Sequence, residues 1–181
     1  MDTTGIPTSF YEHDALSLAP MLLGKYMNMG GVSLIIRETE AYMPNDSACH
    51  AYKGKTNRNA PMFAKGGILY VYLCYGIHQM LNIVTGPQGE PQAVLIRAAE
   101  VISGASIVQK RRGSLDLIGP GKVGQALALN KTFSGEKLGV RLSICDAPEV
   151  SYTAHPRIGI GYAQKKDREA LWRFVMTPTS L

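Results

Sequence analysis

The sequence predicts an α+β fold in one domain that spans residues 1–181. Its length falls within the roughly 100–200 residues that a domain usually holds, and its apolar share of 45% is sufficient for a buried core. Short runs rich in Val, Ile, Leu and Tyr follow one another through tight turns, which favours antiparallel strands, and helical segments lie among them. The sequence contains no internal repeat, low-complexity segment or linker.

The N-terminal part of the chain predicts one helix, one hairpin and a long loop. Apolar residues recur at helical spacing in 14–23, an aspartate can cap the first turn, and a glycine follows the last. Strands over 26–29 and 32–42 then flank a glycine pair that suits a turn. Residues 43–67 contain Pro, Asn, Asp, Gly and Lys without a period, and a loop longer than ~12–15 residues inside a domain is usually functional or disordered. We therefore interpret this segment as a functional loop.

A second hairpin follows, with strands over 68–75 and 78–84 that are rich in Tyr, Val, Leu and Ile. Only Gly76 and Ile77 separate the two strands, and this spacing suits a tight hairpin turn. The rest of the chain predicts, in order, a strand over 92–98, helices over 102–112 and 121–130, and strands near 139–145, 157–162 and 171–176.

Positive charge is concentrated in the later part of the chain. The formal net charge is −4 over residues 1–50, +3 over 51–100 and +6 over 101–181. Such a surface suits a polyanion, because phosphate contacts from Lys and Arg make that kind of binding strong. On charge alone, a merely solvated basic surface with a pI of about 9.1 is equally open.

The cysteine content and the hydropathy indicate a cytosolic protein. Three cysteines, Cys49, Cys74 and Cys145, form no CxxC pair and are expected to be reduced thiols. No apolar run approaches the ~18 residues that would suggest a membrane span, and the N-terminus lacks the layout of a signal peptide.

Two carboxylates and a tyrosine share one face of the strand predicted over 32–42. Because side chains alternate along a strand, Glu38, Glu40 and Tyr42 point to the same side. One interpretation is a solvated strand end. The other is a general base, in which one carboxylate orients and deprotonates a water molecule.

Tyrosines are the unusual feature of the second hairpin. Tyr70 and Tyr72 share a face, which is compatible with an ordinary aromatic core, and we adopt that interpretation for Tyr70. Tyr75 lies at the turn, where its own fold cannot bury it. A ring at a hairpin tip suits a wedge that inserts between stacked base pairs.

Metal and nucleotide chemistry are not supported by the sequence. His50 follows Cys49, but the remaining histidines lack the spacing of metal ligands, so we expect no metal site. The segment Gly119-Pro120-Gly121-Lys122 lacks the spacing and the Ser or Thr of a P-loop. A glycine turn with a lysine at a helix N-terminus can still hold a backbone phosphate.

An ordered set of segments extends over roughly residues 10–176. Each segment alone is a weak signal, whereas the ordered set is specific. The set consists of Glu38-Thr39-Glu40-Ala41-Tyr42, His50, Asn57-Arg58-Asn59, Met62-Phe63, Leu69-Tyr70-Val71-Tyr72, Tyr75-Gly76, Leu81-Asn82-Ile83, Leu95-Ile96-Arg97-Ala98, Gly119-Pro120-Gly121-Lys122, Gln125-Ala126-Leu127-Ala128-Leu129-Asn130-Lys131 and Arg157-Ile158-Gly159-Ile160-Gly161. It resembles the alkyladenine DNA glycosylases, also called 3-methyladenine or methylpurine DNA glycosylases of the eukaryotic type.

The resemblance implies a fold and a catalytic centre. The expected fold is a curved antiparallel sheet with surrounding helices and a protruding hairpin, similar to the C-terminal domain of formyltransferases. Glu40 is expected to act as the general base, with Arg97 helping to hold Glu40 and the water. The backbone carbonyl of Val175 is expected to be a further ligand of that water. Neither a metal nor a cofactor is expected.

The resemblance also implies how DNA is held. Tyr42 is expected on one face of a flipped base, with His50 and Tyr72 on the other, and Asn82 is expected to obstruct the 2-amino group of guanine. Tyr75 is expected to fill the gap left in the duplex. Contacts with the DNA backbone are expected from Arg58, Lys122 and Lys131.

The implied activity is that of a monofunctional glycosylase. We expect alkylated or deaminated purines (3-methyladenine, 7-methylguanine, hypoxanthine, ethenoadenine) to be flipped out of duplex DNA and released in one inverting displacement by water, which starts base-excision repair. No lysine stands at a matched catalytic position to form a Schiff base, and Glu38 lies a further ~6–7 Å along the strand, so we expect neither lyase activity nor double displacement. We expect a cytoplasmic, nucleoid-associated bacterial monomer without an obligate protein partner.

Two other function classes remain open from the residues alone. A non-catalytic nucleic-acid-binding module could use the same basic surface and stacking tyrosines, and would release no base. A hydrolase of nucleosides or modified RNA could use Glu40 as its base and would prefer those substrates to lesion-containing DNA.

Overall fold

The structure, a computed structural model, describes residues 6–177. These residues form nine strands, which belong to one antiparallel sheet. The strands are β1 (Tyr26–Met29), β2 (Val32–Tyr42), β3 (Leu69–Cys74), β4 (His78–Val84), β5 (Ala93–Ser103), β6 (Leu117–Ile118), β7 (Ser143–Cys145), β8 (Tyr152–His155) and β9 (Arg173–Met176).

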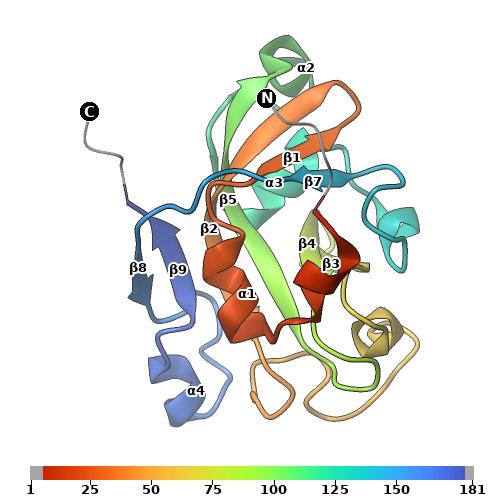
Figure 1. The fold of residues 1–181 in the computed structure, drawn as a ribbon, viewed down its shortest axis with the longest axis vertical. Coiled ribbons are helices and arrows are strands. Elements are labelled where there is room, and N and C mark those ends of the chain that lie inside the picture. Colours follow the sequence, from red (N-terminus) through yellow and green to blue (C-terminus); the bar gives the residue numbers. More distant parts are fainter. Residues whose placement is uncertain (1–5, 178–181) are drawn as a thin grey trace.

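Short helices are placed around the sheet (Figure 1). Among residues 6–177, no helix is long and apolar enough to cross a membrane. The α-helices are α1 (Ala15–Met21), α2 (Ala105–Arg112), α3 (Pro120–Ala126) and α4 (Lys165–Glu169), and the 3-10 helices are η1 (Thr8–Glu12), η2 (Ala60–Phe63) and η3 (Lys131–Phe133).

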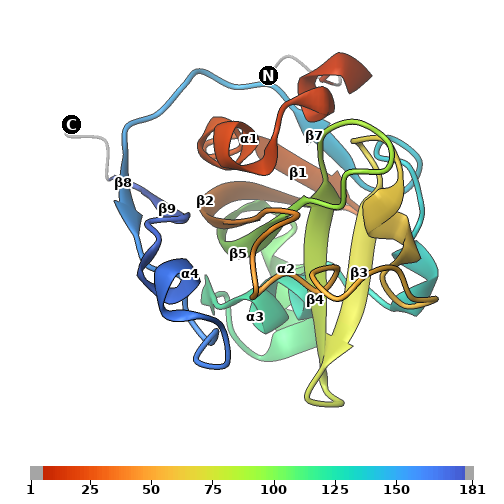
Figure 2. The same ribbon diagram turned by 90° about the horizontal axis from the view of Figure 1, so that it is seen from below.

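The sheet is curled, and its strand order is β3-β4-β5-β2-β1-β7, with β6 beside β5 and β9 beside β2. Figure 2 shows the β3–β4 hairpin projecting from one side of this sheet, whereas β8, β9 and α4 lie at the other side. Helix α1 packs against β2 and β5, and α3 packs against β4 and β5. The predicted α+β fold with a curved antiparallel sheet and a protruding hairpin is therefore confirmed.

The main core lies on the face of β2 opposite Glu40. Leu34, Ile36 and Ala41 of β2 are fully buried in it, together with Leu18 of α1 and Leu22, which follows that helix. Thr39 also faces this side, and its hydroxyl donates to the carbonyl of Ala19 at 2.8 Å. The alternation predicted for β2 thus holds at the strand's end, which leaves the other face for polar side chains.

Several elements agree with the sequence. The first hairpin has the predicted bounds, 26–29 and 32–42. The first helix forms within 14–23, and the Asp14 carboxylate caps it by accepting the Ser17 amide at 3.0 Å. The second hairpin also forms, with a turn in which Tyr75 and Gly76 both have positive φ, as in a type I′ turn.

The strand predicted over 157–162 is wrong. The strand of this region is β8, at Tyr152–His155, and it pairs with β9. Residues 157–162 are irregular because the Arg157 side chain enters a buried ion pair and Gly159 takes a positive φ of 79°. Neither of these features leaves a periodic signal in the sequence.

Other helices and strands differ from their predicted bounds for reasons found in the local structure. The helix predicted over 102–112 begins only at Ala105, because β5 extends to Ser103 by pairing with Ser33. The helix predicted over 121–130 ends at Ala126, and Ala128 has a positive φ of 51°. The strand predicted over 139–145 is confined to 143–145, since Gly139 has a φ of 92° in the preceding turn.

The register of the long β2–β5 pairing shifts at three points, first between Ser33 and Leu34 and then twice beside the two glutamates. The register passes from Ile36↔Ala99 to Glu38↔Ala98, so Arg37 has no partner on β5. The next pair is Thr39↔Ile96, so Arg97 has no partner on β2. β-Bulges bend a strand and re-aim side chains, and they are enriched beside active sites. Here the irregularity brings Arg97 next to the carboxylate face of β2.

Glycines allow α3 to lie directly against the hairpin. A Cβ atom at Gly124 would stand 2.0 Å from the backbone oxygen of Gln79, and one at Gly121 would stand 2.7 Å from Cγ of His78. Both distances are far below van der Waals contact, so a side chain at Gly124 would displace the helix or the strand, and one at Gly121 would displace the His78 ring.

We expect Gly124→Ala to lower the free energy of unfolding by about 1–3 kcal/mol, because the new methyl group pushes α3 away from β4. Chemical denaturation measures this change. Gly161→Ala is the matched control, since no atom lies within 4 Å of its added Cβ. Equal denaturation midpoints for the two variants would show that the close approach of α3 does not matter.

Candidate active site

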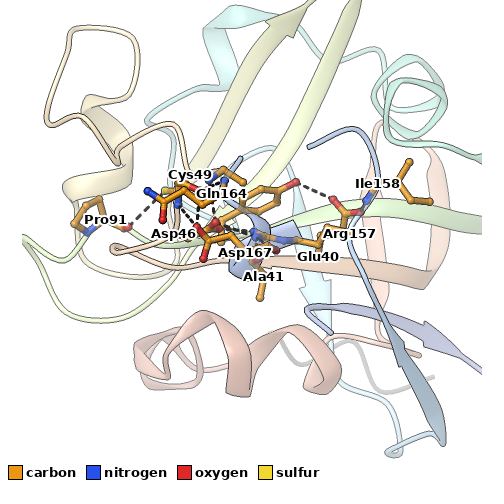
Figure 3. Close-up of polar contacts among 12 residues, drawn as sticks. Glu40, Ala41, Asp46, Cys49, Pro91, Arg157, Ile158, Gln164 and Asp167 are labelled. Carbon is orange, nitrogen blue, oxygen red and sulfur yellow. Dashed lines mark hydrogen bonds and ion pairs between the residues drawn. The ribbon is translucent and has the colours of Figure 1, made fainter. Parts of the chain in front are cut away.

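Glu40 lies near the C-terminal end of β2 and is fully buried. Its Oε1 accepts the backbone N–H of Ile158 at 3.0 Å, and its Oε2 accepts the Tyr42 hydroxyl at 2.8 Å. Figure 3 shows the Glu40 carboxylate beside the Ile158 backbone. Both oxygens are therefore held in a fixed orientation.

The surroundings of Glu40 act on its charge in opposite directions. Burial raises the pKa of Glu40 above its ordinary value. The Ile158 amide and the nearby Arg97 charge oppose that rise in pKa, as does the Tyr42 hydroxyl. Burial, followed by the Glu40 charge, also raises the pKa of Tyr42, so this hydroxyl stays protonated and can donate. The result is a desolvated carboxylate stabilised by directed donors, an arrangement suited to a general base.

Arg97 lies between the two carboxylates of β2. Its Nε is 3.1 Å from Glu38 Oε1 and 3.6 Å from Glu40 Oε1. Glu38 also contacts Nη1 of Arg173 at 2.8 Å. Arg97 therefore reaches Glu40, as the sequence predicts, but its closer partner is Glu38.

A buried ion pair joins the loop after β2 to the segment after β8. The side chains of Arg157 and Asp46 are paired with no exposure to solvent. Nη1 of Arg157 also donates to the carbonyl of Ala41 at 2.9 Å, and Nη2 donates to the carbonyl of Asp167 at 3.2 Å. These contacts converge on one guanidinium (Figure 3).

The same guanidinium supports the Tyr42 ring. Its Cζ lies 4.6 Å from the ring centroid, within the range of a cation–π contact. Hydrogen bonds reinforce the junction, because Ser47 Oγ accepts the Gln164 amide at 2.8 Å and the Ser47 amide donates to Asp167 at 3.0 Å. The Arg157 guanidinium therefore holds the Tyr42 ring in place by packing against one of its faces.

An aromatic pocket adjoins Glu40 through Tyr42, which lines the pocket and donates to Glu40, whereas Glu40 itself is not among the lining residues. The pocket brings together all four residues that the resemblance implies for the base pocket: Tyr42, His50, Tyr72 and Asn82. The remaining lining residues, Ala48, Met62, Tyr70, Ala93 and Tyr162, were not predicted there. Its cavity measures about 30 Å³.

His50 and Tyr72 form one wall of this pocket. Their ring centroids are 4.4 Å apart, and His50 Nδ1 lies 2.9 Å from the Tyr70 hydroxyl. Desolvation of the packed ring, and then the Arg58 charge, lower the pKa of His50, so the imidazole is neutral at neutral pH. Burial raises the pKa of Tyr70 to about 12, so its hydroxyl stays protonated and can donate to Nδ1.

Asn82 lies at the floor of the pocket. It is buried, and its Nδ2 donates to the carbonyls of Tyr70 at 3.2 Å and Met80 at 3.4 Å. These bonds hold the amide group in one orientation.

Tyr75 occupies the tip of the β3–β4 hairpin. Its side chain is 88% exposed. The neighbouring Leu73 and Ile77 are also exposed, and the Ile77 amide closes the turn on the carbonyl of Cys74 at 3.1 Å. The ring has no place in the core, as the sequence predicts.

The three residues expected at the DNA backbone are separate from the pocket lining. Arg58 donates to the carbonyl of Leu73 at 3.0 Å and lies over the Tyr72 ring at 5.4 Å. Lys122 is paired with Asp116, and Lys131 is an exposed residue at the start of η3. The first two therefore already have partners within the chain.

The described residues offer no metal site, and the predicted site residues do not line a second, larger cavity. No group of three or more His, Cys, Asp or Glu residues that could hold a metal occurs among residues 6–177. A larger cavity of about 480 Å³ lies between η1, the 64–68 segment and β7, and none of the predicted site residues lines it. All three cysteines are free thiols.

Sequence reasoning missed the contacts from the C-terminal segment. Val175, whose carbonyl is expected to hold the water, lies on β9 opposite Glu38 on one side and Thr153 on the other, and Arg173 is the residue of β9 opposite Glu40. The backbone amide that contacts the Glu40 carboxylate is that of Ile158. The matched segment from Arg157 to Gly161 was the only available signal, and its assignment to a strand concealed the role of Arg157.

We expect Asp46→Asn to lower the free energy of unfolding by about 3–5 kcal/mol, because it leaves the buried Arg157 charge without its anion. Denaturation in urea measures the loss. Glu169→Gln serves as the control, since its exposed contact with Lys165 at 3.8 Å should contribute at most about 0.5 kcal/mol. A loss for Asp46→Asn as small as that of the control would contradict the structural role of the pair.

Comparison with known proteins gives a consistent result. The family model described as "Methylpurine-DNA glycosylase" matches residues 9–180. A DNA-3-methyladenine glycosylase of Arabidopsis thaliana is 48% identical over 183 residues, which cover 96% of this chain and 72% of the relative. A candidate 3-methyladenine DNA glycosylase of Nitrosococcus oceani is 43% identical, with 94% and 89% covered. The prediction of a hydrolase of the DNA glycosylase class is thereby confirmed, and the chain belongs to the methylpurine-DNA glycosylase family.

Proposed function

We propose that this glycosylase flips alkylated or deaminated purines out of duplex DNA and hydrolyses the N-glycosidic bond with a water molecule activated by Glu40. The observation that carries the proposal is a fully buried carboxylate, oriented by two hydrogen bonds, beside an aromatic pocket. The names of the relatives, as 3-methyladenine DNA glycosylases, support the substrate class.

The pocket suits an electron-deficient purine. Tyr42 would lie against one face of the base, and His50 and Tyr72 against the other. N3- or N7-alkylation leaves the purine cationic, and each electron-rich ring attracts such a cation by ~0.5–2 kcal/mol. The substrates we propose are 3-methyladenine, 7-methylguanine, hypoxanthine and ethenoadenine, with Asn82 obstructing the 2-amino group of normal guanine.

A purine is larger than the cavity of about 30 Å³, so side chains must move when the base enters. His50 and Tyr162 are the exposed members of the lining, whereas Tyr70 and Asn82 are buried. We therefore expect the exposed wall to open while the floor stays in place.

The chemistry requires one carboxylate and one water. Glu40 accepts a proton from the water as its oxygen bonds to C1′ of the deoxyribose and the C1′–N bond breaks. The bonding electrons leave with the purine, which departs neutral when the lesion was a cation. A neutral lesion such as hypoxanthine or ethenoadenine takes up one proton from solvent as it departs. Glu38 is engaged by two arginines, so it is not free to act as a second nucleophile. The lining of the pocket holds no lysine for a Schiff base, which favours a monofunctional, inverting reaction.

Tyr75 would replace the flipped base within the duplex. An exposed ring at the end of a projecting hairpin can fill the gap in the base stack. Arg58 and Lys131 would contact phosphates, and Lys122 would do so after exchanging Asp116 for the DNA. We further propose that the protein acts as a monomer in the cytoplasm, without a cofactor or an obligate protein partner.

Replacing the base should uncouple binding from chemistry. We expect Glu40→Gln to slow single-turnover release of a lesion purine by ~100-fold or more, while affinity for the lesion-containing duplex is retained. Released base, identified by mass spectrometry, and a binding titration measure the two effects. Release at the parental rate would remove Glu40 from the mechanism.

The wedge can be tested separately. We expect Tyr75→Ala to destabilise the flipped complex by about 1–3 kcal/mol, the value of one stacked base, and Tyr75→Phe to retain most of that stabilisation because the ring remains. Fluorescence of ethenoadenine in the duplex reports the flipped fraction. If both variants flip the base as well as the parent, Tyr75 is not the wedge.

A further inference from the structure

We propose that Glu38 is a positioning residue for the reaction, which holds Arg97 away from Glu40 and so keeps Glu40 from being neutralised by a close ion pair. The proposal rests on the role of Glu40 as the general base. It concerns a residue two positions earlier on the same face of β2, which itself has no place in the aromatic pocket.

Arg97 contacts both glutamates of β2, but it lies closer to Glu38 than to Glu40. Nε of Arg97 is 3.1 Å from Glu38 and 3.6 Å from Glu40, and both distances end on Oε1 atoms. The irregular register of β2 and β5 leaves Arg97 without a strand partner at this point. The Arg97 side chain can therefore lie beside either carboxylate, and Glu38 is the partner it contacts more closely.

A second arginine holds Glu38 in place. Nη1 of Arg173 is 2.8 Å from the same oxygen of Glu38, and its Nε donates to the carbonyl of Pro156 at 2.9 Å. Glu38 is only 7% exposed. A nearly buried carboxylate between two guanidiniums is well anchored, because each of its partners compensates for the loss of hydration.

The charge balance at Glu40 follows from this arrangement. Arg97 and Arg157 favour its charged form, whereas Glu38 draws Arg97 toward itself through the shorter contact at 3.1 Å. A free Arg97 would stabilise the carboxylate further and make it a weaker base. The groups that face Glu40 are Glu38 and Tyr42 from β2, Arg97 from β5, Tyr72 from β3, Arg173 from β9, and Arg157 and the Ile158 amide from the segment after β8.

Two substitutions should shift the pH dependence in opposite directions. Glu38→Gln removes the competing anion, so Arg97 is free to pair with Glu40. The acid limb of the single-turnover release rate should then move to lower pH by about half a unit or more, with a lower plateau. Arg173→Met leaves Arg97 as the only cation in contact with Glu38, so Arg97 is held more strongly by Glu38 and stabilises the charge of Glu40 less. The acid limb of the release rate should then move to higher pH.

A matched control is available farther along the same strand pair, where Glu100 lies opposite Ile35. Glu100 is exposed and contacts Arg37 at 3.4 Å, so Glu100→Gln also removes a carboxylate paired with an arginine. We expect its pH profile to coincide with the parental one. The same lesion duplex is used with every variant, so any titration of the DNA affects all pH profiles equally. Thermal melting of each variant identifies a general loss of stability.

The outcomes separate this proposal from the one on which it rests. Opposite shifts for Glu38→Gln and Arg173→Met support the positioning role. If Glu40→Gln is inactive but neither variant shifts the limb, or both shift it in the same direction, Glu38 has only a structural role and the proposal is overturned. If Glu40→Gln is fully active, the assignment of the base has failed first.

Discussion

The buried ion pair between Arg157 and Asp46 is the constraint on which the site depends. It joins two loops that are 111 residues apart in sequence, and both side chains are fully removed from solvent. Through it, the segment after β8 is placed against the end of β2, which brings the Ile158 amide to Glu40 and a cation behind the Tyr42 ring. A buried pair of this kind adds little to stability by itself but is costly to break, so it specifies one arrangement of the two loops.

The sheet provides the second half of the arrangement. The unpaired Arg37 reverses the alternation of β2, so Leu34 and Ile36 before it face the core, whereas Glu38 and Glu40 after it face the opposite side. The second irregularity, at Arg97 of β5, adds that side chain to the face of the glutamates. A general base needs desolvation to stay basic and directed donors to stay ionised. Glu40 has both, because the strand buries it while backbone and tyrosine donors from two segments reach its oxygens.

The sequence predicted the parts of the fold that have local signals. Period-2 alternation placed Glu38, Glu40 and Tyr42 on one face, and the aspartate cap located α1. Ordered motifs indicated His50, Tyr72 and Asn82, which do line one pocket with Tyr42. The strand expected over 157–162 was wrong, and the part played by Arg157 was missed, because a buried ion pair between distant loops leaves no periodic pattern. The closer approach of Arg97 to Glu38 than to Glu40 depends on strand register, which sequence patterns do not determine.

The central claim is that Glu40 faces the sugar of a purine lodged in the aromatic pocket. A crystal structure of the Glu40→Gln variant with a duplex that carries one lesion tests it most directly. The account predicts the purine between Tyr42 and the His50–Tyr72 wall, with an ordered water bridging residue 40 and C1′ of the deoxyribose. A lesion still stacked in the helix, or a residue 40 remote from that sugar, would contradict it.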